Sequence, residues 1–204
     1  MGITVDYVMA PHSPWTYLGH ARFVQMTQAA GATVRLRPVD MRAVFAASGG
    51  LPLHQRAEQR QAYRLLELAR WRDALGLPMH VQPKHFPVSP DVAAKLLIVV
   101  DQADGTDAAL QLAGTLLRAV WADERDLADP ATLAQALADH GLPTAARLQA
   151  ADAPEVQATY ARYTQDALDA GVFGAPSFIV GGELFWGQDR LDFLQQRLQL
   201  AAAS

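Results

Sequence analysis

Residues typical of β-strands occur near the two ends of this 204-residue chain, with a long helical pattern between them. Residues 3–8 alternate and are rich in strand formers, and a second such segment covers residues 32–38. Between them, Ser13 and Pro14 predict an N-cap and the first residue of a helix that ends at Gly31. A strand, a helix and a strand at this spacing form a βαβ unit, so the two strands should run parallel with a right-handed crossover.

From about Asp40 to Gly171 the patterns are helical and are separated by glycine and proline. Tyr63, Leu66 and Ala69, for example, share one face of a predicted helix. The segment contains no internal repeat of 20 to 50 residues and no low-complexity linker. It therefore predicts a block of helices.

After Gly171 the strand pattern returns. Residues 177–180 and 183–186 flank Gly181-Gly182 and predict a hairpin, which leads into a final helix from Leu191. Two strands alone make a poor sheet, so we expect the hairpin to join the βαβ unit in one sheet. The predicted fold is α/β, a thioredoxin-like four-stranded mixed sheet interrupted by a large all-helical insertion. We expect a split thioredoxin-like domain of residues 1–45 and 155–204, and an insertion of residues 46–154.

The composition excludes several functional classes. The chain has no cysteine, which rules out disulfide scaffolds, thiolate metal sites and a redox cysteine pair, so any sulfur chemistry must use an imported thiol. With 17 basic and 21 acidic residues the net charge is −4, which argues against binding nucleic acid or an anionic membrane. The six histidines lack the spacing of a metal site, so we expect no metal. No long apolar run occurs, and we expect a cytoplasmic protein without a membrane segment.

Ser13 is the first candidate for chemistry, because ligands of open α/β sheets collect beyond the carboxyl end of the first strand. The start of a helix offers free N–H groups and partial positive charge, which favour a thiolate or a carboxylate. A serine hydroxyl there can donate a hydrogen bond to an external thiolate. The alternative is an ordinary N-cap, since the same pair recurs at Ser89-Pro90.

Pro176 is the second candidate. A proline at the start of a strand needs an edge, a first position or a cis bond. In thioredoxin-like folds a cis proline faces the loop that precedes the first helix, and the residue before it pairs with the backbone of a ligand. Ala175 would then offer its N–H and C=O to a peptide-like ligand. The alternative is a trans proline that only opens the strand.

These segments together resemble a known family. Residues 13–18 (SPWTYL), 171–178 (GVFGAPSF) and 185–191 (FWGQDRL) resemble those of 2-hydroxychromene-2-carboxylate isomerases. Those enzymes belong to the kappa class of glutathione transferases, within the DsbA-like thioredoxin superfamily. The resemblance is most specific over residues 3–40 and 155–200.

The resemblance implies glutathione as the cofactor and assigns it ligands. Ser13 corresponds to the catalytic serine that contacts the glutathione sulfur, and Ala175 and Pro176 to the pair that holds the cysteinyl backbone. Gln188 and Asp189 correspond to positions that bind the γ-glutamyl end. Arg60 stands near the family's lysine and would bind a carboxylate of glutathione or of the substrate. The resemblance also implies a homodimer.

The same resemblance implies an activity. It is the glutathione-dependent isomerisation of 2-hydroxychromene-2-carboxylate, a small aromatic carboxylate, to trans-o-hydroxybenzylidenepyruvate in aromatic catabolism, by reversible thiolate addition. Trp15, Tyr17 and Phe173 are candidates for a flat aromatic pocket, or for the core. Two alternatives stay open: a kappa-type glutathione transferase or peroxidase, which consumes glutathione, and a non-catalytic thioredoxin-like binding protein in which Ser13 is only a cap.

Overall fold

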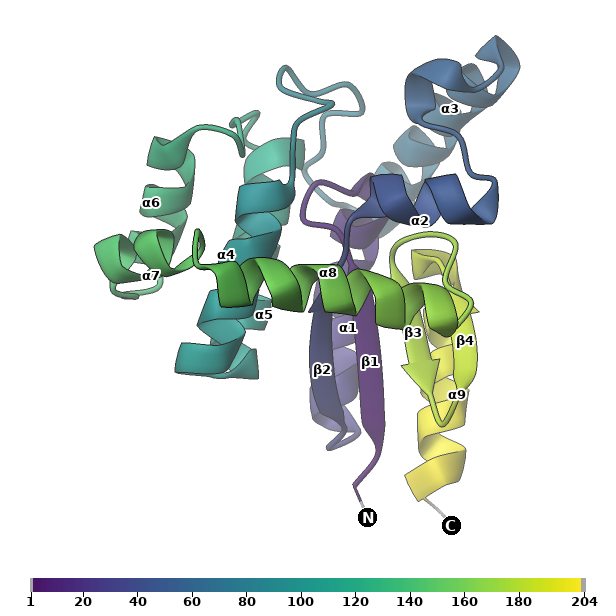
Figure 1. Cartoon of the computed structure of the whole chain (residues 1–204). Helices are drawn as coiled ribbons and strands as arrows, with labels where there is room; N and C mark the ends of the chain where they lie inside the picture. Colours follow the sequence, from purple (N-terminus) through teal and green to yellow (C-terminus); the bar gives the residue numbers. More distant parts are fainter. Residues whose placement is uncertain (1, 203–204) are drawn as a thin grey trace.

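The computed structural model describes residues 2–202 and confirms the four-stranded mixed sheet (Figure 1). The strands lie in the order β2-β1-β3-β4. The first pair, β1 (Thr4–Met9) and β2 (Thr33–Pro38), is parallel, as the βαβ interpretation predicted. The hairpin of β3 (Ser177–Val180) and β4 (Glu183–Trp186) adds to β1 in antiparallel orientation. Both ends of the chain therefore build one sheet.

Local signals determine where the crossover helix α1 (Pro14–Ala29) begins and ends. The Ser13 side chain accepts a hydrogen bond from the backbone N–H of Thr16, so it caps the helix as predicted. Proline suits the first position because the N–H it lacks would have no helical partner. Gly31, with a φ of 61°, follows the helix end and turns the chain toward β2.

Helices fill the chain between β2 and β3. The helices between β2 and β3 are α2 (Met41–Ser48), α3 (Glu58–Leu75), α4 (Asp91–Asp104), α5 (Thr106–Trp121), α6 (Pro130–Asp139), α7 (Thr144–Ala150) and α8 (Pro154–Asp169). A 3-10 turn, η1 (Leu53–Gln55), precedes α3, and a long loop of residues 76–90 joins α3 to α4. A second 3-10 turn, η2 (Gln188–Arg190), precedes the last helix. The last helix, α9 (Leu191–Ala202), follows β4 and η2.

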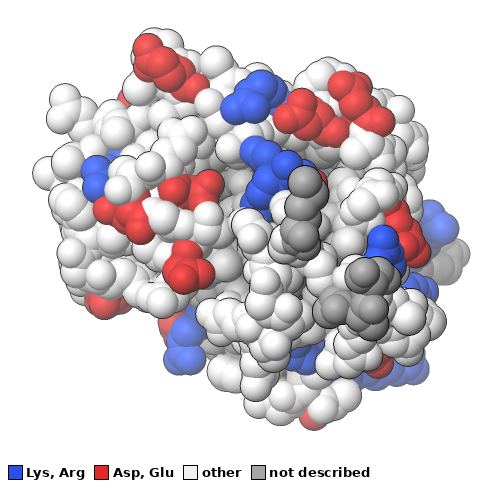
Figure 2. All heavy atoms as spheres, turned by 90° about the horizontal axis from the view of Figure 1, so that it is seen from below, with Lys and Arg blue, Asp and Glu red and all other residues white. Residues whose placement is uncertain are grey.

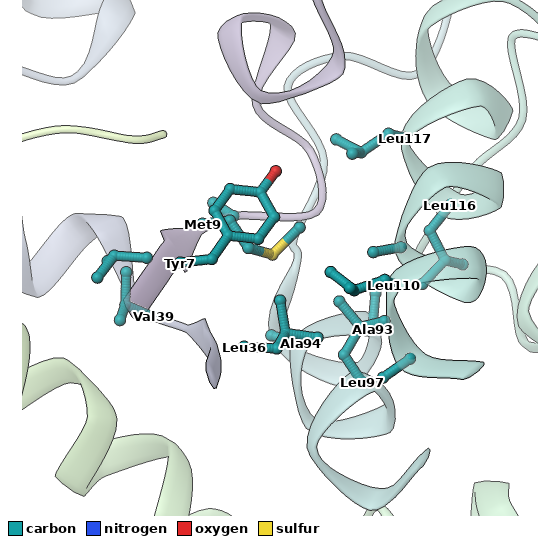
Figure 3. Packing of buried hydrophobic residues seen from close by; sticks show 14 of the residues in the cluster. Tyr7, Met9, Leu36, Val39, Ala93, Ala94, Leu97, Leu110, Leu116 and Leu117 are labelled. Atoms are coloured by element: carbon teal, nitrogen blue, oxygen red, sulfur yellow. The ribbon is translucent and has the colours of Figure 1, made fainter. Parts of the chain in front are cut away.

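The helices cover both faces of the sheet. In Figure 1, α8 passes across one face while α1 lies behind the strands, and α2 and α3 stand above the carboxyl end of β1. Figure 3 shows Met9 of β1 pointing toward α4 and α5, where Leu97 and Leu110 belong to the same cluster of buried residues. The sheet and the helical segment thus share one apolar core. The division into two domains stays a prediction.

The surface carries charges of both signs. On the face seen in Figure 2, basic and acidic side chains are interspersed over a mostly uncharged surface. Among residues 2–202, no helix is both long enough and apolar enough to cross a membrane.

Candidate active site

Ser13 lies where β1 leads into α1, on the wall of a cavity of about 580 Å³. Its Oγ accepts the N–H of Thr16 at 3.2 Å and donates to the carbonyl oxygen of Ala175 at 3.3 Å. The capping bond uses a lone pair of the oxygen and leaves the hydroxyl proton available. Ser13 is therefore both a helix cap and part of the cavity wall.

Ala175 brings the second predicted segment to the same wall. The Ala175–Pro176 peptide bond is cis, and Ala175 lines the cavity. The Pro176 carbonyl accepts the N–H of Gly187 at 2.9 Å, which ties this loop to the end of β4. Within residues 2–202, the N–H of Ala175 has no hydrogen-bond partner. It is free to pair with the backbone of a ligand.

The cavity lining is mainly apolar and aromatic, but only one of the three aromatic residues that we expected there belongs to it. Trp15 lines it together with Phe45 and Phe86. The hydroxyl of Tyr17 instead donates to the Pro78 carbonyl at 2.5 Å, outside the cavity lining. Phe173 is exposed and packs on Trp186, with ring centroids 4.7 Å apart. Neither Phe45 nor Phe86 was singled out for an aromatic pocket, because α2 and the loop before α4 reach the cavity only through the tertiary fold.

The arginine predicted to bind a carboxylate lies outside the cavity. Arg60 is exposed on α3 and does not line the wall, whereas Arg56 and Arg64 do. The guanidinium of Arg64 lies over the rings of Phe86 and Trp121, at 5.3 and 6.0 Å from their centroids. Burial, and then the positive charge of Arg56, lowers the pKa of Arg64 to about 10. Both arginines are cations at neutral pH.

Gln188 and Asp189 also lie outside the cavity lining. Gln188 is buried, and both its backbone carbonyl and its side-chain oxygen accept hydrogen bonds from Arg22. Asp189 is exposed and forms an ion pair of 2.7 Å with Arg190. Both residues follow Gly187, whose N–H donates a hydrogen bond to the Pro176 carbonyl, so η2 lies beside the loop that contains the cis proline. Their role as ligands of a γ-glutamyl group stays a prediction.

His12 is a further residue of the cavity wall that lies next to Ser13. Burial lowers its pKa to about 4, against smaller opposing effects of Asp91 and Asp40, so the imidazole is neutral at pH 7. Its Nδ1 is buried and has no hydrogen-bond partner among the described residues. The backbone carbonyl of His12 accepts the indole N–H of Trp121 at 3.2 Å, which links the loop before α1 to α5.

Comparison with known proteins assigns the family. The family model of the DSBA-like thioredoxin domain matches residues 4–199. The chain belongs to the DSBA-like thioredoxin domain family. This DSBA-like domain is also similar, over nearly its full length, to curated relatives named 2-hydroxychromene-2-carboxylate isomerase. The relative from Sphingobium xenophagum is 28% identical over 196 residues, which cover 96% of this chain and 97% of that protein.

Solved structures share the fold of this DSBA-like domain. One is described as 2-hydroxychromene-2-carboxylate isomerase, with a TM-score of 0.84 and 23% identity, covering 98% of this chain and 99% of the other. Another is the cytosolic disulfide reductase DsbM from Pseudomonas aeruginosa with GSH, with a TM-score of 0.67 and 18% identity, covering 96% and 99%. The resemblance drawn from the sequence motifs is thereby confirmed.

Proposed function

We propose that this protein catalyses the glutathione-dependent isomerisation of 2-hydroxychromene-2-carboxylate to trans-o-hydroxybenzylidenepyruvate. The observation that carries the proposal is the position of the Ser13 hydroxyl, at the start of α1 and on the wall of an aromatic cavity, beside the free N–H of Ala175. The curated relatives of similar length that bear the isomerase name support the same reaction.

The residues around Ser13 suit a thiol tripeptide. The bond from Ser13 Oγ to the Ala175 carbonyl, at 3.3 Å, is longer than the usual 2.7–2.8 Å of an O–H to O bond, so the hydroxyl can turn toward another acceptor. The Ala175 N–H can pair with the carbonyl of a cysteinyl residue. Ser13, Ala175 and the first turn of α1 would therefore hold the cysteinyl part of glutathione.

Bound glutathione would supply a thiolate that adds to the carbon–carbon double bond of the ring-opened substrate. The resulting single bond can rotate, and elimination then restores the double bond in the trans form and returns the thiolate unchanged. The Ser13 hydroxyl donates a hydrogen bond to the anionic sulfur, which lowers the pKa of the thiol. The amino end of α1 adds partial positive charge in the same place. Trp15, Phe45 and Phe86 provide flat apolar surfaces for an aromatic ring and keep water away from it.

Titration with glutathione tests this function. We expect wild-type protein to bind glutathione with the thiol ionised near neutral pH, seen as thiolate absorbance. Ser13→Ala should raise the pKa of the bound thiol and lower kcat/KM by about a hundredfold, the effect typical of losing one donor to a developing anion. Wild-type thiol that stays protonated when bound would remove the proposed role of Ser13.

Two controls separate the proposal from its alternatives. Asp129→Ala removes the cap of α6, a bond of 2.9 Å to the N–H of Ala131, far from the cavity, and should lower stability by about 1 kcal/mol without changing turnover. If Ser13→Ala behaves in the same way, Ser13 is only a cap. Total free glutathione should stay constant during turnover, whereas a transferase or peroxidase would consume it.

A further inference from the structure

Two guanidinium groups face the cavity without a counterion. The side chain of Arg64 makes no hydrogen bond or ion pair with any of residues 2–202. Arg56 uses its Nε to donate to the Leu51 carbonyl at 2.8 Å, and its guanidinium lies over the ring of Phe45 at 5.6 Å from the centroid. No carboxylate of the described chain forms a salt bridge with either residue. The cavity wall around α3 therefore carries positive charge that no acidic side chain of the described residues neutralises.

The third arginine of the cavity wall, Arg42, differs from Arg56 and Arg64 because it has acidic partners within the protein. Arg42 pairs with Asp40 at 3.3 Å and with Asp91 at 2.8 Å, so its charge is neutralised within the protein. His12 carries no charge at neutral pH, because burial lowers its pKa to about 4. The net positive charge of the cavity thus comes from Arg56 and Arg64.

The setting of Arg64 suits a flat anion. Its Cζ lies over the rings of Phe86 and Trp121, within the range of a cation–π contact, and this contact leaves its N–H groups for a ligand. An arginine fork matches the two oxygens of a carboxylate. The positive charge of Arg56 lies close enough to lower the pKa of Arg64, so an anion between the two groups would relieve their repulsion.

We propose that Arg64, supported by Arg56, binds the carboxylate of a planar aromatic acid and so selects and orients the substrate. The inference rests on the proposed function and adds the residues that recognise the charged end of the substrate. The aromatic part of the acid then lies against Phe45 and Phe86, in the same cavity as Ser13. Arg60 does not contribute, because it is exposed on α3 outside the cavity.

Binding of trans-cinnamate, measured by calorimetry without glutathione, tests this assignment. Cinnamate carries an aromatic ring conjugated to a carboxylate, and cinnamamide is its uncharged counterpart. Arg64→Leu should weaken cinnamate binding by about tenfold or more, the loss typical of a charged hydrogen-bonded pair, and leave cinnamamide binding unchanged. Arg60→Leu is the matched control on the same helix and should leave both affinities within about twofold of wild type.

The glutathione affinity of the same variants separates the two possible sources of a carboxylate. We expect Arg64→Leu to leave it unchanged. A loss confined to glutathione, an equal loss of both ligands, or a wild-type protein that binds no cinnamate would overturn the assignment. Should Arg64→Leu fail to fold, Arg64→Lys replaces it, and we expect weaker cinnamate binding from it because lysine keeps the charge but loses the fork.

The outcome is independent of the isomerase assay. If no isomerase activity is found but cinnamate binding depends on Arg64, the carboxylate site stands and the proposed reaction fails. If the enzyme isomerises its substrate and Arg64→Leu leaves both KM and cinnamate binding unchanged, the reaction stands and this inference fails.

Discussion

The imidazole of His20 lies inside the protein, between the sheet and α5. Its Nε2 is 2.9 Å from the Leu110 carbonyl, and its Nδ1 is 3.1 Å from the hydroxyl of Tyr7. Because a carbonyl can only accept, we assign the ring proton to Nε2, and Nδ1 then accepts from Tyr7. Burial outweighs the bond to Leu110 and lowers the pKa of His20 from 6.5 to about 4. One neutral side chain therefore joins β1, α1 and α5.

This depressed pKa predicts that stability falls in mild acid. Above pH 6.5 His20 is neutral in both folded and unfolded chains, and stability is complete. As the pH falls from 6.5 toward 4, the unfolded chain takes up the proton first, and about 1.4 kcal/mol per pH unit is lost. His12, whose pKa burial lowers in the same way, adds a similar loss. Urea unfolding at pH 7, 6 and 5 should therefore show a slope of about 3 kcal/mol per pH unit in wild type, and His20→Gln should reduce it by about half.

Tyr7→Phe is the control for this prediction. It removes the hydrogen bond to Nδ1 but keeps the buried imidazole, so stability should fall by about 1–2 kcal/mol at every pH while most of the slope remains. A slope that is the same in wild type and His20→Gln would show that His20 does not report on acid unfolding.

The sequence predicted the cavity residues next to the sheet, such as Ser13, better than the cavity residues on the helices. Ser13 and Ala175 were found because a Ser-Pro helix start and a proline before a strand are local signals, and the fold brings these two residues together. Arg60 was expected to reach the ligand, but Arg64, one helical turn away, is the residue on the wall. Periodicity indicates a side of a helix and cannot tell how far along it a cavity extends.

At the scale of elements, helices begin and end at the prolines and glycines that predicted their limits, but the predicted buried faces were less reliable. Proline and glycine act on the backbone next to them, so α1 begins at Pro14 as predicted. Tyr63 and Leu66 share the predicted apolar face of α3, yet they are 56% and 55% exposed. Which face is covered depends on neighbours distant in sequence, and α3 extends away from the rest of the molecule (Figure 1).

The contact between α1 and η2 depends on the absence of a side chain at Gly19. A methyl group there would lie 2.7 Å from Gln188 Cβ and 3.3 Å from its Cα. Alanine is a better helix former than glycine by about 1 kcal/mol, but this clash should outweigh that gain. We predict that Gly19→Ala lowers the free energy of unfolding by about 1–2 kcal/mol in denaturant titrations.

Ala62→Gly calibrates the helix propensity in the same protein. Residue 62 is exposed within α3, so the substitution should lower stability by about 1 kcal/mol through propensity alone. A more stable Gly19→Ala protein would show that η2 moves away from α1 without loss of packing.

At the scale of the whole molecule, the buried residues form one cluster that runs from the sheet into α4 and α5 (Figure 3). Small domains with one core unfold cooperatively. We therefore predict a single transition, seen at the same denaturant concentration by tryptophan fluorescence and by far-ultraviolet circular dichroism. Leu97→Ala should lower stability by about 2–5 kcal/mol and move both signals together. Two separate transitions would mean that the helical segment unfolds on its own.

The oxygen of Ser13 also determines how the protein would respond to oxidants. Peroxide converts a catalytic cysteine to sulfenic and then to higher acids, but a chain without cysteine offers it no thiol. If the protein uses glutathione as proposed, oxidants would lower its activity by lowering the concentration of reduced glutathione. Activity would then return when that concentration recovers, without chemical repair of residue 13.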